Sequence, residues 1–163
     1  MYFLPSPFHL RAVDCASDND QAFVRALYHA SRGDLQQLQA DPAFIKQLIT
    51  MQQNLQEQGY RQAYPQARQW LIERHGAPIG RLIVHPGQEA LRVVDITLLP
   101  QAQGQGAGAV VLAGLQTHAA ALGWSVSLAV NHHNGPARRL YARLGFAVES
   151  EDELQQQLRW SAS

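Results

Sequence analysis

The chain has 163 residues, a length that predicts a single domain with a sizeable core over residues 1–163. Its 13 Lys and Arg residues balance its 13 Asp and Glu residues, so no net charge favours nucleic acid or an anionic membrane as a partner. The sequence has neither the pattern of a signal peptide nor an apolar run of the ~20 residues that a membrane-spanning helix needs. Because Cys15 is the only cysteine, no intramolecular disulfide can form, and we expect a buried or half-buried thiol in a cytoplasmic protein.

The first half of the chain predicts a strand, two helices and three further strands. Ser17 and Asp41 are typical N-caps, and Pro42 suits the first position of a helix. In chain order, we expect a strand at 9–13, helices at 17–33 and 41–59, and strands at 67–73, 78–84 and 90–98. The stripe expected to face the core in the second helix comprises Phe44, Ile45, Leu48, Ile49 and Leu55.

The second half predicts two helices and three strands. A glycine-rich segment at 103–108 opens the first helix, and Asn134 caps the second. We expect helices from this segment to Gly123 and from Asn134 to Gly145, and strands at 125–130, 146–149 and 154–160. The order of all these elements predicts an α/β (α+β) fold in which a mixed sheet carries helices on both faces.

The glycine-rich segment points to a bound phosphate group. Glycines let the backbone turn sharply and approach a ligand, and the free N–H groups of a helix's first turn attract a pyrophosphate. A P-loop would need Lys and then Ser or Thr after Gly108, where the chain has Ala109 and Val110. A dinucleotide site would need an acid after the next strand, which is instead followed by Asn131. A flexible turn without a ligand and a coenzyme A site are the other interpretations, although alternating glycines weaken a helix start that has no compensating role.

Two motifs favour coenzyme A. Gln103-x-x-Gly106-x-Gly108 resembles the pyrophosphate-binding motif R/Q-x-x-G-x-G/A of the GNAT superfamily of N-acetyltransferases. Residues 94–100 resemble the fourth strand of that family, and the strong resemblance covers residues 92–146. The second motif, which resembles the family's N-x-x-A-x-x-L-Y-x-x-x-G-F signature, is Asn134-x-x-Ala137-x-x-Leu140-Tyr141-x-x-Leu144-Gly145-Phe146. The chain departs from the family in the first motif residue, Gln rather than the commoner Arg, and in the longer Asn134-Gly135-Pro136.

The resemblance implies a fold and an activity. The fold would be a twisted, mostly antiparallel sheet of about seven strands, with helices on both faces and splayed central parallel strands. The activity would be that of an acetyl-coenzyme A-dependent N-acetyltransferase, which moves an acetyl group to a primary amine of a small molecule or peptide by direct attack. The alternative is a non-catalytic acyl-coenzyme A-binding sensor or regulatory module. The family resemblance also allows a homodimer, although no sequence feature demonstrates one.

Individual residues acquire roles through the resemblance. Tyr141 would protonate the departing coenzyme A thiolate, and Asp95 is the best candidate for the base that deprotonates the amine. Tyr141 could instead be ordinary core, and Asp95 could be a structural hydrogen-bonding group. Glu73 and Glu149 are weaker candidates for the base. The residues implied in cofactor binding are Ile96 and Leu98 through their backbone groups, Gln103, Gly104, Gln105, Gly106, Ala107, Gly108 and Ala109 around the pyrophosphate, and Asn134.

The histidines, Arg138 and the residues around the acceptor pocket allow three further predictions. The seven histidines show no spacing typical of a metal site, so we expect no metal. Arg138 could reach a phosphate of the coenzyme, although a surface role is the more ordinary one. We expect acceptor specificity to come from the helical pair at 23–59 and the last hairpin, with Tyr60 and Tyr64 bordering the acceptor pocket.

Overall fold

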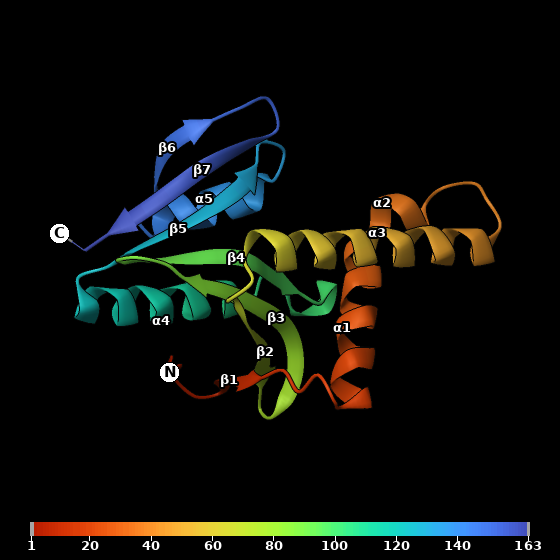
Figure 1. Ribbon diagram of the computed structural model, residues 1–163, viewed down its shortest axis with the longest axis horizontal. Coiled ribbons are helices and arrows are strands. Elements are labelled where there is room, and N and C mark those ends of the chain that lie inside the picture. The colour runs from red at the N-terminus through yellow and green to blue at the C-terminus, as the bar shows by residue number, and fades with distance from the viewer. Residues whose placement is uncertain (1, 163) are drawn as a thin grey trace.

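The structure is a computed structural model that describes residues 2–162. Within these residues, seven strands form one sheet in the order β1-β2-β3-β4-β5-β7-β6 (Figure 1). The strands are β1 Phe8–Ala12, β2 Arg68–Arg74, β3 Ala77–Pro86, β4 Ala90–Leu98, β5 Ser125–Asn131, β6 Ala147–Glu151 and β7 Gln155–Ser161. The β4–β5 pair is parallel and the other neighbouring pairs are antiparallel. This is the mixed, mostly antiparallel sheet that the sequence predicted.

The helices begin where the sequence offers caps. They are α1 Asp18–Ser31, α2 Gly33–Gln36, α3 Pro42–Ala63, α4 Ala107–Leu122 and α5 Gly135–Arg143, with a 3-10 turn η1 at Pro100–Ala102. Ser17 Oγ accepts a hydrogen bond from the backbone N–H of Asp20 at 3.2 Å, and the Asp41 carboxylate accepts one from the first turn of α3 at 2.8 Å. Asn134 Oδ1 accepts a hydrogen bond from the N–H of Ala137 at 3.2 Å. These side chains satisfy N–H groups that have no partner inside the helix.

Two expectations for α3 are wrong. The helix continues past Gly59, because a single interior glycine costs a helix only about 1 kcal/mol. Phe44 and Leu55, expected to face the core, are 55% and 57% exposed. The residues that α3 does bury are Ile49 and Gln53, on the side where it packs against α1. The N-terminal half of α3, with α2, extends away from the sheet (Figure 1).

Two residues near α1 also differ from expectation. Gly33, expected to end α1, lies beyond the C-cap Arg32 and begins the short helix α2. Cys15, expected to be at least half-buried, is exposed in the connection between β1 and α1. Helix ends and loop burial depend on neighbouring elements, so local sequence signals place them poorly.

The parallel strands β4 and β5 splay apart, as the family resemblance implied. They pair only over residues 90–92 and 125–127, and beyond this point they diverge (Figure 1). From residue 93 onward, β4 therefore presents backbone groups that β5 does not pair. An unpaired strand edge of this kind can bind an extended chain through its peptide groups.

A β-bulge marks the point of divergence. The adjacent β3 residues Ile83 and Val84 pair with Asp95 and Val93, so Val94 is an extra residue in β4. A bulge bends its strand and increases the local twist, which accounts for the turn of β4 away from β5. Strict alternation of faces along β4 would place Val93 and Asp95 on the same face. The bulge interrupts this alternation, and Val93 belongs to the core that α4 covers.

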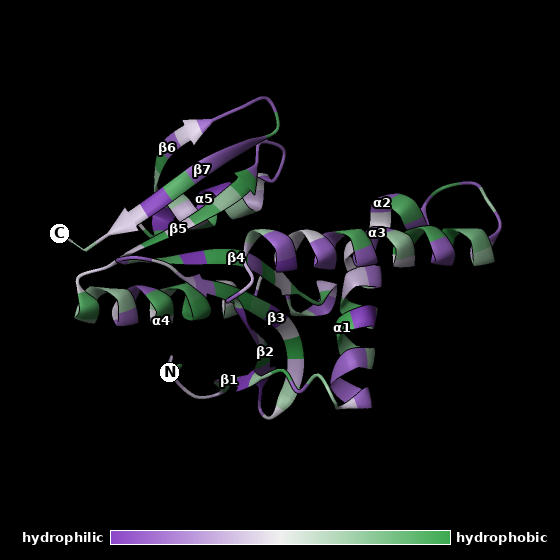
Figure 2. Cartoon of the chain, in the orientation of Figure 1, coloured by the Kyte–Doolittle hydropathy of each residue, from purple (hydrophilic) through white to green (hydrophobic). Residues whose placement is uncertain are grey.

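Helix α4 and the sheet enclose the main core. Figure 2 shows an apolar α4, whereas α3 carries polar and apolar residues in turn. Val111, Leu112 and Leu115 of α4 are fully buried against strand residues such as Leu91 and Val126. Helices α1 and α3 pack on one another, α1 contacts β3 and β4, and Glu57 of α3 forms an ion pair with Arg81 of β3. The central strand β4 therefore has α4 on one face and the α1–α3 pair on the other.

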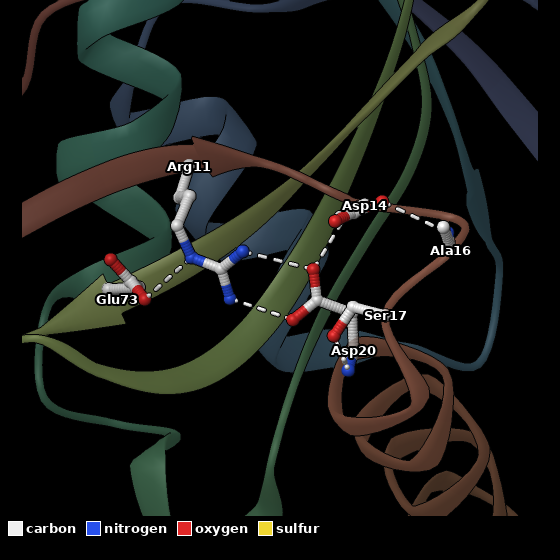
Figure 3. Close-up of polar contacts among 6 residues, drawn as sticks. All are labelled: Arg11, Asp14, Ala16, Ser17, Asp20 and Glu73. Atoms are coloured by element: carbon white, nitrogen blue, oxygen red, sulfur yellow. Dashed lines mark hydrogen bonds and ion pairs between the residues drawn. The ribbon is translucent and has the colours of Figure 1, made fainter.

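An ion-pair network fixes the start of α1 to the sheet (Figure 3). Arg11 of β1 donates two hydrogen bonds to the Asp20 carboxylate, at 2.8 and 2.9 Å, and one to Glu73 of β2 at 3.1 Å. Asp20 also accepts from the backbone N–H of Asp14 at 2.9 Å. A bidentate pair of this geometry is specific in orientation, so the network sets the direction in which α1 leaves the sheet.

Candidate active site

A cleft of about 430 Å³ lies where β4 and β5 diverge, bounded by β4, the start of α4 and α5. The residues that the sequence predicted for cofactor binding and that line this cleft are Ile96, Leu98, Gln103, Gly104, Gly106, Ala107, Gly108, Ala109 and Asn134. Tyr141, the predicted acid, lines it too. Residues that the sequence places on a strand, a loop and two helices thus meet around one cavity.

The backbone N–H groups at the N-terminus of α4 have no capping side chain as an acceptor. Gly104 and Gly106 have φ angles of +74° and +87°, a left-handed conformation that side chains rarely adopt. Gly106 is the N-cap, and no side chain caps the helix, so the N–H groups of the first turn point out of the helix without an internal acceptor. A Cβ on Gly108 would lie 3.4 Å from the Leu140 side chain, which shows how closely α4 and α5 approach. These features fit a pyrophosphate at this helix end.

The residues predicted to bind the coenzyme differ in their contacts and in whether they line the cleft. The Gln103 side chain donates a hydrogen bond to the backbone oxygen of Leu98 at 3.2 Å. Asn134 both caps α5 and lines the cleft. Gln105 does not line the cleft, because its side chain accepts a hydrogen bond from Arg74 at 2.6 Å. A role of Gln105 in cofactor binding therefore rests on its backbone alone.

Tyr141 lies on the inner side of α5. Its side chain is buried and meets the ring of Phe146 edge-on, with 5.9 Å between the ring centroids. Burial, and secondarily the charge of Asp95, raises the pKa of the Tyr141 hydroxyl above its ordinary value. The group is therefore held in its protonated form at neutral pH, as a general acid must be.

Asp95 lies on the other face of β4 from Ile96. Thr97 Oγ1 donates to its two carboxylate oxygens at 2.9 and 3.1 Å, and Arg81 approaches it at 3.5 Å. Burial raises the pKa of Asp95 above its ordinary value, and Arg81 and Thr97 oppose that rise. Desolvation is the largest influence, so the carboxylate is a stronger base than one in water. Asp95 and Tyr141 both line the gap between β4 and β5.

The other candidate bases lie in ion pairs elsewhere. Glu73 is bound by Arg11 at 3.1 Å in the network that fixes α1. Glu149 is half exposed on β6 and pairs with Arg159 at 2.9 Å. Neither residue lines the cleft or the gap between β4 and β5. Arg138 donates to the backbone oxygen of His132 at 3.2 Å and lines a separate groove beside β6 and β7.

Sequence reasoning missed Arg143. Among the described residues that line the cleft, it carries the one charged side chain, and no ion pair within residues 2–162 holds it. It lies in the last turn of α5, where a cation also suits the helix dipole. Its position two residues after Tyr141 in the second motif is the signal that could have identified it.

A second, smaller pocket lies on the opposite face of β4. It has a volume of about 100 Å³ and is enclosed by α1, α3, β3 and β4. Its lining includes Tyr28 of α1, the C-cap residue Arg32, Gln56 of α3, and Asp95. The helical pair at 23–59 therefore does face the same strand as the cleft, although Tyr60 and Tyr64 are not part of this lining.

The two tyrosines expected at the pocket border have different surroundings. Tyr60 is close enough to Asp95 for the carboxylate to help burial raise the pKa of the Tyr60 hydroxyl. Tyr64 packs its ring against His85, with 5.2 Å between the ring centroids. Tyr60 thus belongs to the surroundings of Asp95, whereas Tyr64 supports the adjoining part of β3.

Among residues 2–162, no group of three His, Cys, Asp or Glu side chains has the spacing to hold a metal ion. No helix in the same range combines the length and the apolar character required to span a membrane.

Three solved structures illustrate the fold relationship. The PaiA N-acetyltransferase from Thermoplasma acidophilum, in complex with coenzyme A, is 16% identical with a TM-score of 0.68, over 95% of this chain and 99% of that one. The ribosomal L7/L12 alpha-N-protein acetyltransferase RimL, also with coenzyme A, is 19% identical with a TM-score of 0.66, over 98% and 97%. The ribosomal-protein-S18-alanine N-acetyltransferase from Escherichia coli is 16% identical with a TM-score of 0.63, over 96% and 94%. No curated protein matches the sequence significantly.

The family itself is identified from the sequence. The model of the acetyltransferase (GNAT) family matches residues 26–146, which is more than half of the chain. The matched region contains the glycine-rich helix start, the splayed strands and Tyr141. The protein therefore belongs to the GNAT acetyltransferase family and is an acetyl-coenzyme A-dependent N-acetyltransferase.

Proposed function

We propose that residues 1–163 act as one catalytic domain that transfers the acetyl group directly to a primary amine of a small molecule or peptide. The observation that carries this proposal is the placement of Asp95 and Tyr141 on the same gap between β4 and β5. Aminolysis of a thioester needs a base for the attacking amine and an acid for the departing thiolate. A carboxylate of raised pKa and a protonated phenol supply these two groups.

Coenzyme binding would use both ends of the cleft. The free N–H groups at the start of α4, between Gly104 and Ala109, fit the pyrophosphate. The unpaired edge of β4 at Ile96 and Leu98 fits the amide groups of the pantetheine arm. Arg143 would add the one positive side chain that meets the phosphates.

Tyr141 would complete the transfer. Tyr141 lines both the cleft and the gap that Asp95 also lines. Its raised pKa keeps the hydroxyl protonated at neutral pH, so a proton is available to the sulfur as the C–S bond breaks. Backbone N–H groups of the splayed strands would stabilise the developing oxyanion. This route needs no acyl-enzyme, and Cys15 lies outside the lining of the cleft, the gap and the small pocket.

The acceptor would enter from the α1–α3 side. The small pocket on that face shares Asp95 with the gap, so an amine in the pocket would reach the carboxylate and attack the thioester through the gap between β4 and β5. A volume of about 100 Å³ holds a small group, on the order of three water molecules at ~30 Å³ each. We therefore expect the amine to be carried on a narrow, unbranched arm.

The test is a screen of primary amines, with free coenzyme A and the acetylated product both measured. Turnover on one class of amine, abolished or strongly reduced in Tyr141→Phe and Asp95→Asn, would support the assignment. Glu149→Gln serves as the control, because this carboxylate is half exposed and pairs with Arg159 instead. Acetylated protein that accumulates before any acceptor is added, seen by intact mass spectrometry, would contradict direct transfer.

We also propose a cytoplasmic location for the protein. A cytoplasmic setting agrees with a single, exposed cysteine that has no partner for an intramolecular disulfide. A homodimer stays a prediction from the family resemblance. Light scattering during size-exclusion chromatography measures it directly.

A further inference from the structure

One buried arginine is shared by two acids beside the reaction gap. Arg81 of β3 is 4% exposed. One terminal nitrogen donates to Glu57 of α3 at 2.8 Å, and the other approaches Asp95 of β4 at 3.5 Å. Its Nε has no hydrogen-bond partner within residues 2–162, so both ion pairs depend on the terminal nitrogens.

The register of the sheet explains this arrangement. Arg81 pairs directly with Thr97 across the β3–β4 ladder, and Asp95 is therefore a diagonal neighbour on the same face. Diagonal neighbours in a ladder are about 7–8 Å apart at their Cα atoms, a separation that a long arginine side chain can span. Helix α3 lies over this face and brings Glu57 to the same guanidinium.

The two contacts compete for one cation. An N–H···O distance of 2.8 Å is typical of a strong charge-assisted hydrogen bond, whereas 3.5 Å is at the limit of one. The guanidinium is therefore held mainly by Glu57, and its pairing with Asp95 is loose. A full ion pair with Arg81 would favour the charged form of Asp95 and make it a weaker base.

We infer that Glu57 is a positioning residue that draws Arg81 away from Asp95 and so keeps the Asp95 carboxylate basic enough to accept a proton from the acceptor amine. The inference rests on the proposed function, in which Asp95 is the base. Glu57 lines neither the cleft nor the small pocket, and it contacts Arg81 rather than Asp95. The charge of Glu57 also raises the pKa of Asp95 directly, although less than burial does. We call the three residues Glu57, Arg81 and Asp95 the shared-arginine triad.

Other groups around Asp95 bear on its protonation and are the same in every variant below. Thr97 donates to the carboxylate from the same strand. Tyr60 of α3 and Tyr141 of α5 are close enough for the charge of Asp95 to raise the pKa of their hydroxyls. Tyr28 of α1 and the C-cap residue Arg32 line the pocket that Asp95 also lines, and Arg32 is paired with Asp34. Arg81 is thus the cation in direct contact with Asp95 among the described residues.

The direct test is a titration of Asp95 itself. The carboxyl carbon of Asp95 is followed by ¹³C NMR as the pH changes, in the substrate-free protein and in variants. Glu57→Gln removes the stronger partner of Arg81, so the pKa of Asp95 should fall below the wild-type value. Arg81→Gln removes the cation, so the pKa of Asp95 should rise. Arg81→Lys provides a second variant with a retained charge if Arg81→Gln fails to fold.

A double-mutant cycle separates positioning from a direct field effect. If Glu57 acts through Arg81, Glu57→Gln should lower the pKa of Asp95 much less in the Arg81→Gln background than in the wild type. An equal fall in both backgrounds overturns the inference, because the carboxylate of Glu57 would then act on Asp95 directly. An unchanged Asp95 titration in the folded Glu57→Gln variant also overturns it.

Activity supplies the second measurement. The acid limb of the pH dependence of kcat/KM should move to lower pH in Glu57→Gln, and the maximal value should fall roughly threefold to tenfold as the base weakens. Glu149→Gln, another carboxylate paired with an arginine, should leave both unchanged. If the NMR titration moves and the acid limb does not, the role of Asp95 as base is overturned, while the triad's control of Asp95 is supported.

Discussion

The side chain of Gln103 donates a hydrogen bond to the backbone oxygen of Leu98, with 3.2 Å between nitrogen and oxygen. This bond joins the first residue of the glycine motif to the end of β4. The glycine-rich turn is thus anchored on the strand whose free edge adjoins it, and the start of α4 is fixed relative to the cleft. The proposed pyrophosphate contact at the start of α4 and the proposed pantetheine contact at β4 therefore both depend on how this turn is held against the strand.

Replacing Gly106 by Ala should weaken acetyl-coenzyme A binding about tenfold. A side chain at φ +87° costs ~1–2 kcal/mol, and relief of that strain would turn the N–H groups of α4 away from the pyrophosphate. Calorimetric titration measures the affinity. Gly76→Ala is the matched control, because Gly76 has a φ of +78° in the turn between β2 and β3 and likewise has open space around its Cβ position. Equal affinity losses in the two variants would contradict a local role for Gly106.

Replacing Arg143 by Gln should lower the affinity for acetyl-coenzyme A by roughly threefold to tenfold, and should flatten its dependence on salt. The physical reason is the loss of the one charged side chain that lines the cleft. Arg138→Gln is the control, since that arginine lies on the same helix but lines a different groove. A larger effect at Arg138 than at Arg143 would reassign the phosphate contact.

Replacing Tyr141 by Phe should reduce kcat by about a hundredfold and leave the affinity for acetyl-coenzyme A nearly unchanged. Burial raises the pKa of the hydroxyl, so the acid form persists as the pH rises and is lost only above the ordinary range of a tyrosine. The alkaline decline of kcat should therefore lie above that range in the wild type and be absent in the variant. A variant with wild-type kcat would show that Tyr141 is only part of the core.

Replacing Asp20 by Asn should lower the melting temperature by several degrees at neutral pH, because Arg11 loses its bidentate partner (Figure 3). Arg11 lowers the pKa of Asp20 to about 2, whereas an unfolded Asp has a pKa of about 3.9. The stabilisation is therefore complete above the unfolded pKa and is lost as the pH falls toward 2. The wild type and the variant should converge in acid. Asp18→Asn, at an exposed position in the same turn, should change little.

Replacing Cys15 by Ser should leave kcat within about twofold of the wild-type value, because direct transfer requires no covalent acyl-cysteine. The thiol is exposed, so alkylation with iodoacetamide should also be complete and harmless. Loss of turnover after either treatment would argue for a covalent route.

Local signals in the sequence predict the order of the main elements and the residues of the candidate coenzyme site. Ser17, Asp41 and Asn134 are caps that act within a few residues, and the glycines at 104 and 106 are required by local backbone angles. Signals of this kind are readable because the interacting groups are close in the chain. The cleft can be predicted as well, because the glycine turn, β4 and Tyr141 belong to motifs that resemble those of one family, and the fold fixes their relative positions.

The surroundings of the candidate base and the buried side of α3 depend on contacts between elements that are distant in the chain. Arg81 is 24 positions from Glu57 and 14 from Asp95, so no local pattern reveals that one guanidinium serves both. The extra residue Val94 depends on the pairing of β4 with β3, which a strand pattern alone does not specify. The exposure of Phe44 likewise reflects where α3 meets its neighbours, because helical periodicity identifies an apolar stripe without showing what covers it.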